Sequence, residues 1–135
     1  KNKSIILIDD SLVRGTTCNK IVKMLYESGA KEVHVRIACP EIKYPDFYGV
    51  DMPTKEELLA HKKNIREMCN HIGAKSLEFL SLTGLYTALK GEKRNSNYPQ
   101  FSDHYFTGDY PIIPHDNLTN IRSKQLSLLS GKSNN

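Results

Sequence analysis

The segment at residues 5–17 limits the fold of this chain most, because an apolar run is followed at once by two carboxylates and a glycine-containing turn. Residues 5–8 are four consecutive branched apolar residues, which predict a short strand buried on both faces, as in a parallel sheet. Open α/β sheets bind ligands beyond the carboxyl ends of their strands, and the helical pattern after Thr17 would expose free N–H groups at its first turn. The segment therefore predicts an anion site between a strand and a helix.

The residues of the turn suit a phosphate group. Gly15 permits a positive φ and lets backbone N–H groups approach a phosphate closely. Thr16 and Thr17 add hydroxyl donors, and we expect one of them to cap the following helix. Arg14 supplies either positive charge to the site or a solvated cap.

The carboxylates Asp9 and Asp10 suit a sugar or a metal ion. They can accept hydrogen bonds from vicinal ribose hydroxyls, or hold Mg²⁺ together with water and phosphate oxygens. Consecutive strand residues point to opposite faces, so both carboxylates reach one ligand only if the chain is already turning there. A strand end with a polar turn would also contain such residues, but the complete string favours a binding site.

The string at residues 6–17, which reads Ile-Leu-Ile-Asp-Asp-Ser-Leu-Val-Arg-Gly-Thr-Thr, resembles the phosphoribosyl pyrophosphate (PRPP) motif of type I phosphoribosyltransferases. From Asp10 onward it resembles the form found in amidophosphoribosyltransferases. Further matches follow in the family's order at residues 29–33, 48–53, 57–60, 72–77 and 106–111. The resemblance implies an α/β fold, the C-terminal portion of a type I phosphoribosyltransferase domain with a Rossmann-like parallel sheet and a C-terminal extension.

The resemblance also implies a function. Members of this family make 5-phosphoribosylamine from PRPP and glutamine, the first committed step of de novo purine biosynthesis. It implies that Mg²⁺ is bound with the help of Asp9 and Asp10, and that no general base lies in this part. The residues that it implies for PRPP binding are Asp9, Asp10, Ser11, Arg14, Gly15, Thr16 and Thr17.

The family has parts that match nothing in this sequence. An N-terminal domain with a cysteine nucleophile releases ammonia from glutamine, and further strands and a mobile loop precede the PRPP motif. We therefore expect the chain to be the C-terminal part of a longer, homo-oligomeric enzyme and to be inactive alone. Two alternatives stay open: a PRPP- or nucleotide-binding regulatory module without catalysis, and a partner-dependent subunit or inert remnant.

Some family members carry an iron–sulfur cluster with cysteine ligands in this part of the chain. The matching positions here are Asp46, Ser102 and Tyr105, none of which supplies a thiolate, so no cluster is expected. The cysteines are Cys18, Cys39 and Cys69, whose spacing fits no zinc motif. We expect reduced thiols, with Cys18 and Cys69 in the core.

Composition narrows the function classes further. A net charge of +4, with 19 basic residues dispersed among 15 acidic ones, argues against a nucleic-acid interface. No apolar run approaches the length of a membrane span and no signal peptide is visible, so we expect a cytoplasmic protein. We expect each of the five histidines to be solvated or to cap a helix, as none belongs to a metal or catalytic motif.

The sequence also predicts the elements that follow the motif. A helix is expected at residues 18–28 and a strand at 33–37, half exposed or at a sheet edge. Residues 40–53 are expected to form a loop packed by its own aromatic side chains. A capping box of Thr54 and Glu57 predicts one helix that runs to about residue 71.

The last third of the chain is predicted in less detail. A strand is expected at residues 77–82, and a helix capped by Thr83 is expected to end near 89. The domain is expected to span residues 1–91, and an extension residues 92–135. In this extension, residues 105–114 would strap onto the domain, an imperfect helical stripe lies at 118–128, and the tail is expected to be disordered.

Overall fold

The computed structural model describes residues 1–49, 54–91 and 93–112. Helices and strands alternate along most of this length, as in other α/β proteins. In chain order the elements are β1 (Ser4–Asp9), α1 (Thr16–Glu27), β2 (Glu32–Ile37), the 3₁₀ turn η1 (Lys55–Glu57), α2 (Leu59–Lys62), α3 (Ile65–Ile72), β3 (Ser76–Phe79), α4 (Leu82–Lys90) and α5 (His104–Thr107).

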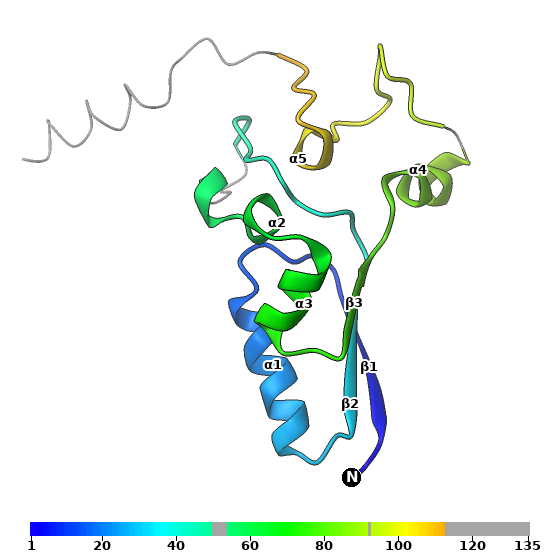
Figure 1. The fold of residues 1–135 in the computed structure, drawn as a ribbon. Coiled ribbons are helices and arrows are strands. Elements are labelled where there is room, and N and C mark those ends of the chain that lie inside the picture. The colour runs from blue at the N-terminus through cyan, green and yellow to red at the C-terminus, as the bar shows by residue number, and fades with distance from the viewer. Residues whose placement is uncertain (50–53, 92, 113–135) are drawn as a thin grey trace, which may run out of the picture.

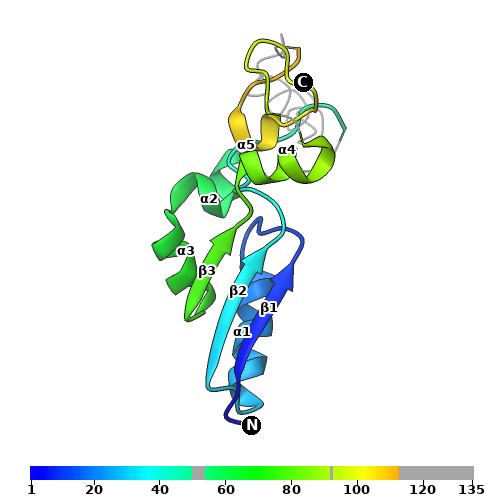
Figure 2. The same ribbon diagram turned by 90° about the vertical axis from the view of Figure 1, so that its right-hand side faces the viewer.

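The three strands form one parallel sheet in the order β1-β2-β3. Leu7 of β1 lies opposite Val35 of β2, which in turn lies opposite Leu77 of β3. Because the strands are parallel, their carboxyl ends meet at one edge of the sheet, the upper edge in Figure 2. The predicted α/β class with a parallel sheet is confirmed.

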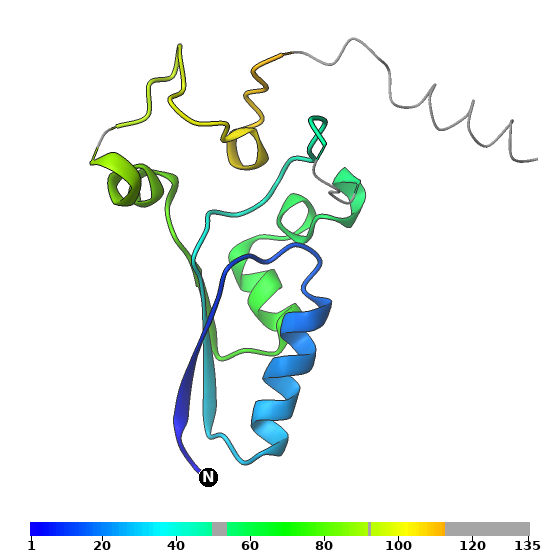
Figure 3. The same cartoon turned by 180° about the vertical axis from the view of Figure 1, so that it is seen from behind.

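Helices α1 and α3 cover one face of this sheet (Figures 1 and 3). The core lies between them and β2, because alternate residues of β2 point toward the helices. Fully buried side chains of this core include Val22, Val33, Val35, Met68 and Ile72. The predicted core position is confirmed for Cys18, which is buried here, whereas Cys69 is only partly buried and packs against the core.

One prediction about the strands is wrong. β1 is not buried on both faces, because Ile6 is 67% exposed and Ile8 is 73% exposed. Both side chains point away from α1 and α3, which lie on the other face of the sheet. For β2, the predicted option of a half-exposed strand is confirmed, and the other option, an edge, does not apply because β2 is the central strand of the described sheet.

The single helix predicted after Thr54 is also wrong. The capping box of Thr54 and Glu57 is present, but it begins only the turn η1. Lys63 is extended, and a second capping box of Asn64 and Glu67 then begins α3. The segment at residues 55–72 therefore forms three short elements, which bend around the N-terminal end of α1.

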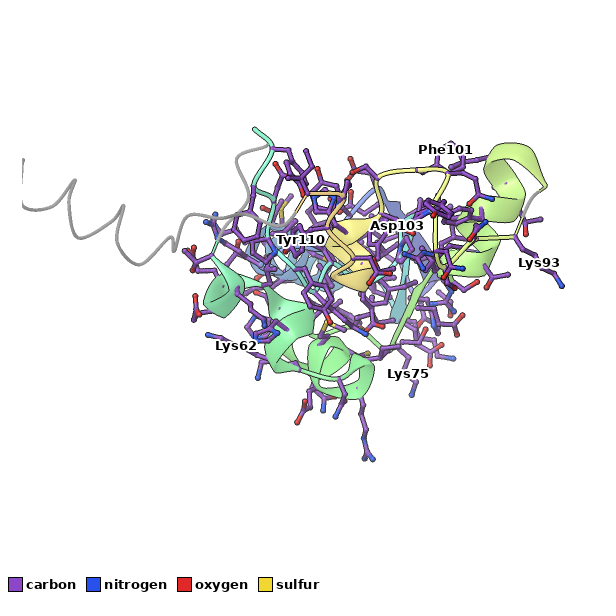
Figure 4. The ribbon with its side chains drawn as sticks, turned by 90° about the horizontal axis from the view of Figure 1, so that it is seen from above. Lys62, Lys75, Lys93, Phe101, Asp103 and Tyr110 are labelled. Carbon is purple, nitrogen blue, oxygen red and sulfur yellow. The ribbon has the colours of Figure 1, made fainter. Side chains whose placement is uncertain are left out.

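The loop after β2 packs against the segment around α5. The backbone N–H groups of Lys43 and Tyr44 donate to the carbonyl of Tyr105, and the Phe47 ring lies 5.0 Å from that of Tyr110. Figure 4 looks down on this region and shows Tyr110 beside α5. The predicted strap is confirmed as far as residue 112, and the aromatic rings Phe47 and Tyr48 of the loop pack against His104 and Tyr110 of the strap segment.

Three smaller predictions can also be compared with the structure. β3 falls in the predicted region, and α4 is capped by Ser81, whose hydroxyl accepts from the N–H of Gly84, and not by Thr83. The stripe at 118–128 and the tail lie outside the described residues, and the domain boundary after residue 91 stays a prediction. Within the described ranges no helix has the length and apolar character needed to cross a membrane.

Candidate functional site

The predicted binding residues line one cleft at the carboxyl end of β1. The cleft has a volume of about 340 Å³ and is lined by residues 9–18. All seven predicted residues contribute to it, namely Asp9, Asp10, Ser11, Arg14, Gly15, Thr16 and Thr17. We call residues 10–15, which join β1 to α1, the phosphate loop. The loop is short, so the acidic pair and the first turn of α1 face the same space.

The chain bends directly after β1. The carboxylate of Asp9 accepts a hydrogen bond from the backbone N–H of Asp10 at 3.0 Å, and the carboxylate of Asp10 accepts one from the Ser11 hydroxyl at 3.3 Å. Asp10 is exposed and Asp9 is half-buried. The bend meets the condition under which two consecutive carboxylates can serve one ligand.

Gly15 begins α1 with a φ of 77° and makes no side-chain capping bond. The N–H groups of the first helical turn therefore have no side-chain cap and stay available to an anion. Thr16 and Thr17 are the first residues of the helix and are exposed, so the prediction that a threonine caps the helix is wrong. Gly15 has the capping position because its left-handed backbone suits glycine.

Packing gives a second reason for this glycine. Gly15 is buried, and a Cβ placed on it would lie 2.9 Å from Leu59 Cδ2 and 3.2 Å from His71 Cδ2. The loop also holds α2 directly, because the N–H of Leu59 donates to the carbonyl of Val13 at 2.8 Å. The segments around α2 and α3 therefore form the back wall of the phosphate loop.

Arg14 supplies positive charge at the mouth of the cleft. Its guanidinium lies 3.2 Å from a carboxylate oxygen of Glu57 in η1. The sequence identified Glu57 only as part of a capping box. Nothing local pointed to this contact, because 43 residues separate the two side chains.

The acidic pair fits a magnesium ion by its donor chemistry. Carboxylate oxygens are the protein ligands that Mg²⁺ prefers, and this ion keeps waters and substrate phosphate oxygens in its remaining positions. Within the described ranges no three metal-binding side chains come together. The two carboxylates that line the cleft, Asp9 and Asp10, would suit an ion shared with a phosphorylated substrate.

The thiols near the cleft are poor nucleophiles. Burial raises the pKa of Cys39 to about 11, with a smaller effect from the charge of Asp10. Burial also raises the pKa of Cys18, and the charge of Asp9 adds to this. Neither thiol ionises readily near neutral pH, so neither is suited to covalent catalysis.

A second polar cluster was missed by the sequence analysis. His104 is 1% exposed and donates or accepts at both ring nitrogens: Nε2 lies 2.8 Å from Asp46 and Nδ1 lies 3.0 Å from the Ser102 hydroxyl. The prediction that each histidine is solvated or caps a helix is wrong for His104. Asp46 and His104 are 58 residues apart, so spacing gave no signal.

This cluster contains the three positions that were matched to cysteine ligands of the family. Asp46 and Ser102 bond to His104, and the Tyr105 ring stacks on it at 4.0 Å. Burial, together with the charge of Asp46 and a hydrogen bond to it, raises the pKa of Tyr105. The three side chains thus converge on His104, which the sequence analysis did not predict.

Known proteins are similar to this chain over most of its length. No protein-family model matches it. The amidophosphoribosyltransferase of Rhizobium etli is 51% identical over 131 residues, which are 96% of this chain and 26% of that protein. The amidophosphoribosyltransferase of Staphylococcus epidermidis is 48% identical over 125 residues, or 93% of this chain and 25% of that protein.

Solved structures give the same result. The glutamine PRPP amidotransferase of B. subtilis, in complex with ADP and GMP, superposes with a TM-score of 0.77 at 44% identity, covering 86% of this chain and 26% of that one. The chain spans about a quarter of the length of these relatives. Both in sequence and in fold, it matches the C-terminal portion of the amidophosphoribosyltransferase family.

Proposed function

We propose that this chain supplies the PRPP-binding part of an amidophosphoribosyltransferase. The whole enzyme would transfer ammonia, released from glutamine, to C1 of PRPP and form 5-phosphoribosylamine, glutamate and pyrophosphate. This is the first committed step of de novo purine biosynthesis, carried out in the cytoplasm. The remaining transferase strands and the glutaminase domain would come from the rest of a homo-oligomeric protein.

The observation that carries the proposal is the uncapped start of α1 in a cleft that also holds an acidic pair. The 5′-phosphate would lie at this helix end, where backbone N–H groups, Thr16 and Thr17 can donate to its oxygens. Ser11 also lines the cleft, and its hydroxyl, which donates to Asp10 in this structure, would turn to donate to the phosphate instead. Gly15 keeps the backbone close enough for these contacts.

Asp9 and Asp10 would hold the ribose hydroxyls and take part in binding Mg²⁺. When bound, the ion would neutralise the charge of the pyrophosphate group as it leaves. The two carboxylates would fix the ribose and stabilise the positive charge that develops at C1. Ammonia that arrives unprotonated would need no base, so the proposal requires no ionised thiol, in agreement with the raised pKa of Cys18 and Cys39.

A binding module without catalysis would have the same loop, so the test must measure turnover. We suggest a full-length protein that carries this segment, assayed with PRPP and free ammonia so that glutamine hydrolysis is bypassed. The double variant Asp9→Asn, Asp10→Asn keeps side-chain volume and removes charge. We expect kcat and kcat/KM to fall together by about a hundredfold or more, because the lost interaction acts in the transition state.

The matched control is Glu27→Gln, which removes a carboxylate from the exposed end of α1, far from the cleft. This variant should keep the kinetics of the parent enzyme. A parent enzyme that binds PRPP with no turnover would favour the regulatory module instead. Unchanged kinetics in the double variant would contradict the roles of Asp9 and Asp10.

A further inference from the structure

Glu57 links the phosphate loop to the segment that precedes α2. One of its carboxylate oxygens, Oε1, lies 3.2 Å from Nη2 of Arg14, which lines the cleft. Both side chains are about half exposed, at 54% for Arg14 and 48% for Glu57. The pair therefore lies at the rim of the site, where solvent and a ligand can both reach it.

The orientation of Glu57 is set by its own capping box. Its other oxygen, Oε2, accepts from the backbone N–H of Thr54 at 3.1 Å and from the Thr54 hydroxyl at 3.3 Å. These bonds, led by the one to the Thr54 backbone and joined by the charge of Arg14, lower the pKa of Glu57. The carboxylate is therefore ionised at neutral pH and presents Oε1 to Arg14.

A second attachment joins the same two segments. Two residues after Glu57, the N–H of Leu59 donates to the carbonyl of Val13, and the side chain of Leu59 packs under Gly15. The backbone on both sides of Arg14 is thus in contact with Leu59, two residues after Glu57. Glu57 fixes the end of the Arg14 side chain to the segment that already fixes its backbone.

We propose that Glu57 is a positioning residue for substrate binding: it holds the Arg14 guanidinium at the mouth of the cleft, oriented to receive the anionic groups of PRPP. This inference rests on the proposed function. An unpaired arginine loses much rotamer freedom when it binds a phosphate, whereas an arginine already held by a carboxylate loses less. A guanidinium has five N–H donors, so one bond to Glu57 leaves others for phosphate oxygens.

The chain offers a matched pair of variants for the test. Glu57→Gln keeps an oxygen that can accept from the Thr54 N–H and removes the charge that faces Arg14. Glu67→Gln makes the same change in the second capping box, where Glu67 accepts from the N–H of Asn64 at 2.9 Å, away from the cleft. Any effect of a weakened capping box on stability should appear in both variants.

The measurement is steady-state kinetics in the full-length enzyme, with PRPP varied and free ammonia saturating. We expect Glu57→Gln to raise the KM for PRPP by about threefold or more with little change in kcat, the pattern of lost ground-state binding at a half-exposed ion pair. Glu67→Gln should leave both constants unchanged. An unchanged or lower KM in Glu57→Gln would overturn the proposal, and a lower value would mean that Glu57 competes with the phosphate.

A second comparison separates this proposal from a general loss of structure. In an Arg14→Gln background, the change Glu57→Gln should have no further effect on KM, because Glu57 acts through Arg14. Additive effects of the two changes would contradict the proposal. If the parent enzyme had no activity with PRPP, the proposed function itself would fail, whereas an active parent with identical Glu57→Gln and Glu67→Gln variants would refute only the positioning role.

Discussion

The replacement Gly15→Ala tests whether the phosphate loop is held by packing as well as by backbone conformation. The φ of Gly15 is 77°, and a left-handed conformation costs an alanine about 1–2 kcal/mol. The new Cβ would also lie 2.9 Å from Leu59 Cδ2 and 3.2 Å from His71 Cδ2. Crowding of this kind in a packed region costs about 1–3 kcal/mol. We therefore expect a total loss of about 2–5 kcal/mol in the free energy of unfolding.

Gly73→Ala is the matched control. Gly73 ends α3 with a φ of 76°, nearly the value of Gly15, but a Cβ there would meet nothing within 4 Å. The Gly73→Ala variant should therefore lose only the conformational contribution to the free energy of unfolding, about 1–2 kcal/mol. Urea denaturation of the chain, followed by circular dichroism, gives both free energies. Similar destabilisation in the two variants would refute the packing argument, because it would mean that the side chains of Leu59 and His71 move away from the new Cβ at no cost in free energy.

Four further predictions concern ionisation, activity and iron content. Burial alone would raise the pKa of Asp103, but hydrogen bonds from Arg94 and Tyr86 lower this pKa below its ordinary value of 3.8. The stability that the ionised carboxylate contributes is therefore present above pH 3.8 and is lost as the pH falls through the folded-state pKa. Asp103→Asn should remove this acid-dependent loss in unfolding curves below pH 4, and an unchanged pH dependence would contradict it. Because the pKa of Cys39 is raised from 9.0 to about 11, iodoacetamide should alkylate it at pH 8 about a hundredfold more slowly than in urea-unfolded chain, as mass spectrometry can measure; equal rates would show that the thiol is not protected. The isolated chain should show neither glutaminase activity nor phosphoribosylamine synthesis, and turnover of glutamine by the chain would contradict this. The full-length enzyme should contain no stoichiometric iron, and visible charge-transfer absorption would contradict that expectation.

That the candidate binding residues share one cleft could be predicted from the sequence, because these residues are contiguous. The strand, the acidic pair and the glycine turn lie within thirteen residues, so local geometry alone brings them to one place. The identity of the capping residue was not predictable in the same way. A threonine hydroxyl and a left-handed glycine can both begin a helix, and the choice of Gly15 depends on Leu59 and His71, which lie far along the chain.

The broken helix after Thr54 shows a different limit. A second capping pattern, Asn64 followed by Glu67, was present in the sequence, but the apolar stripe across it also fits one continuous helix. The structure interrupts that stripe at Lys63, which is extended. The break lets α2 lie under the phosphate loop while α3 packs on the sheet, an arrangement that a continuous helix of the same length would not allow.

The predictions of burial that were wrong have a common cause. A run of four branched apolar residues predicts a strand with two covered faces, yet one face of β1 leaves Ile6 and Ile8 exposed. Periodicity reports which faces a strand can bury, and it does not supply the element that covers them. The same reasoning applies to His104, whose burial depends on Asp46, Tyr48 and Tyr110 from segments that no local pattern connects.

Glu57 has one contact that a local sequence pattern predicted and one contact that depends on the fold. The sequence predicted its capping box correctly, because Thr54 and Glu57 are three residues apart and the pattern is local. A carboxylate has two oxygens, however, and the capping box occupies only Oε2. The partner of the other oxygen is set by the path of the chain between η1 and the phosphate loop. A residue can therefore have a local structural role that sequence reveals and a role in the site, toward Arg14, that only the fold reveals.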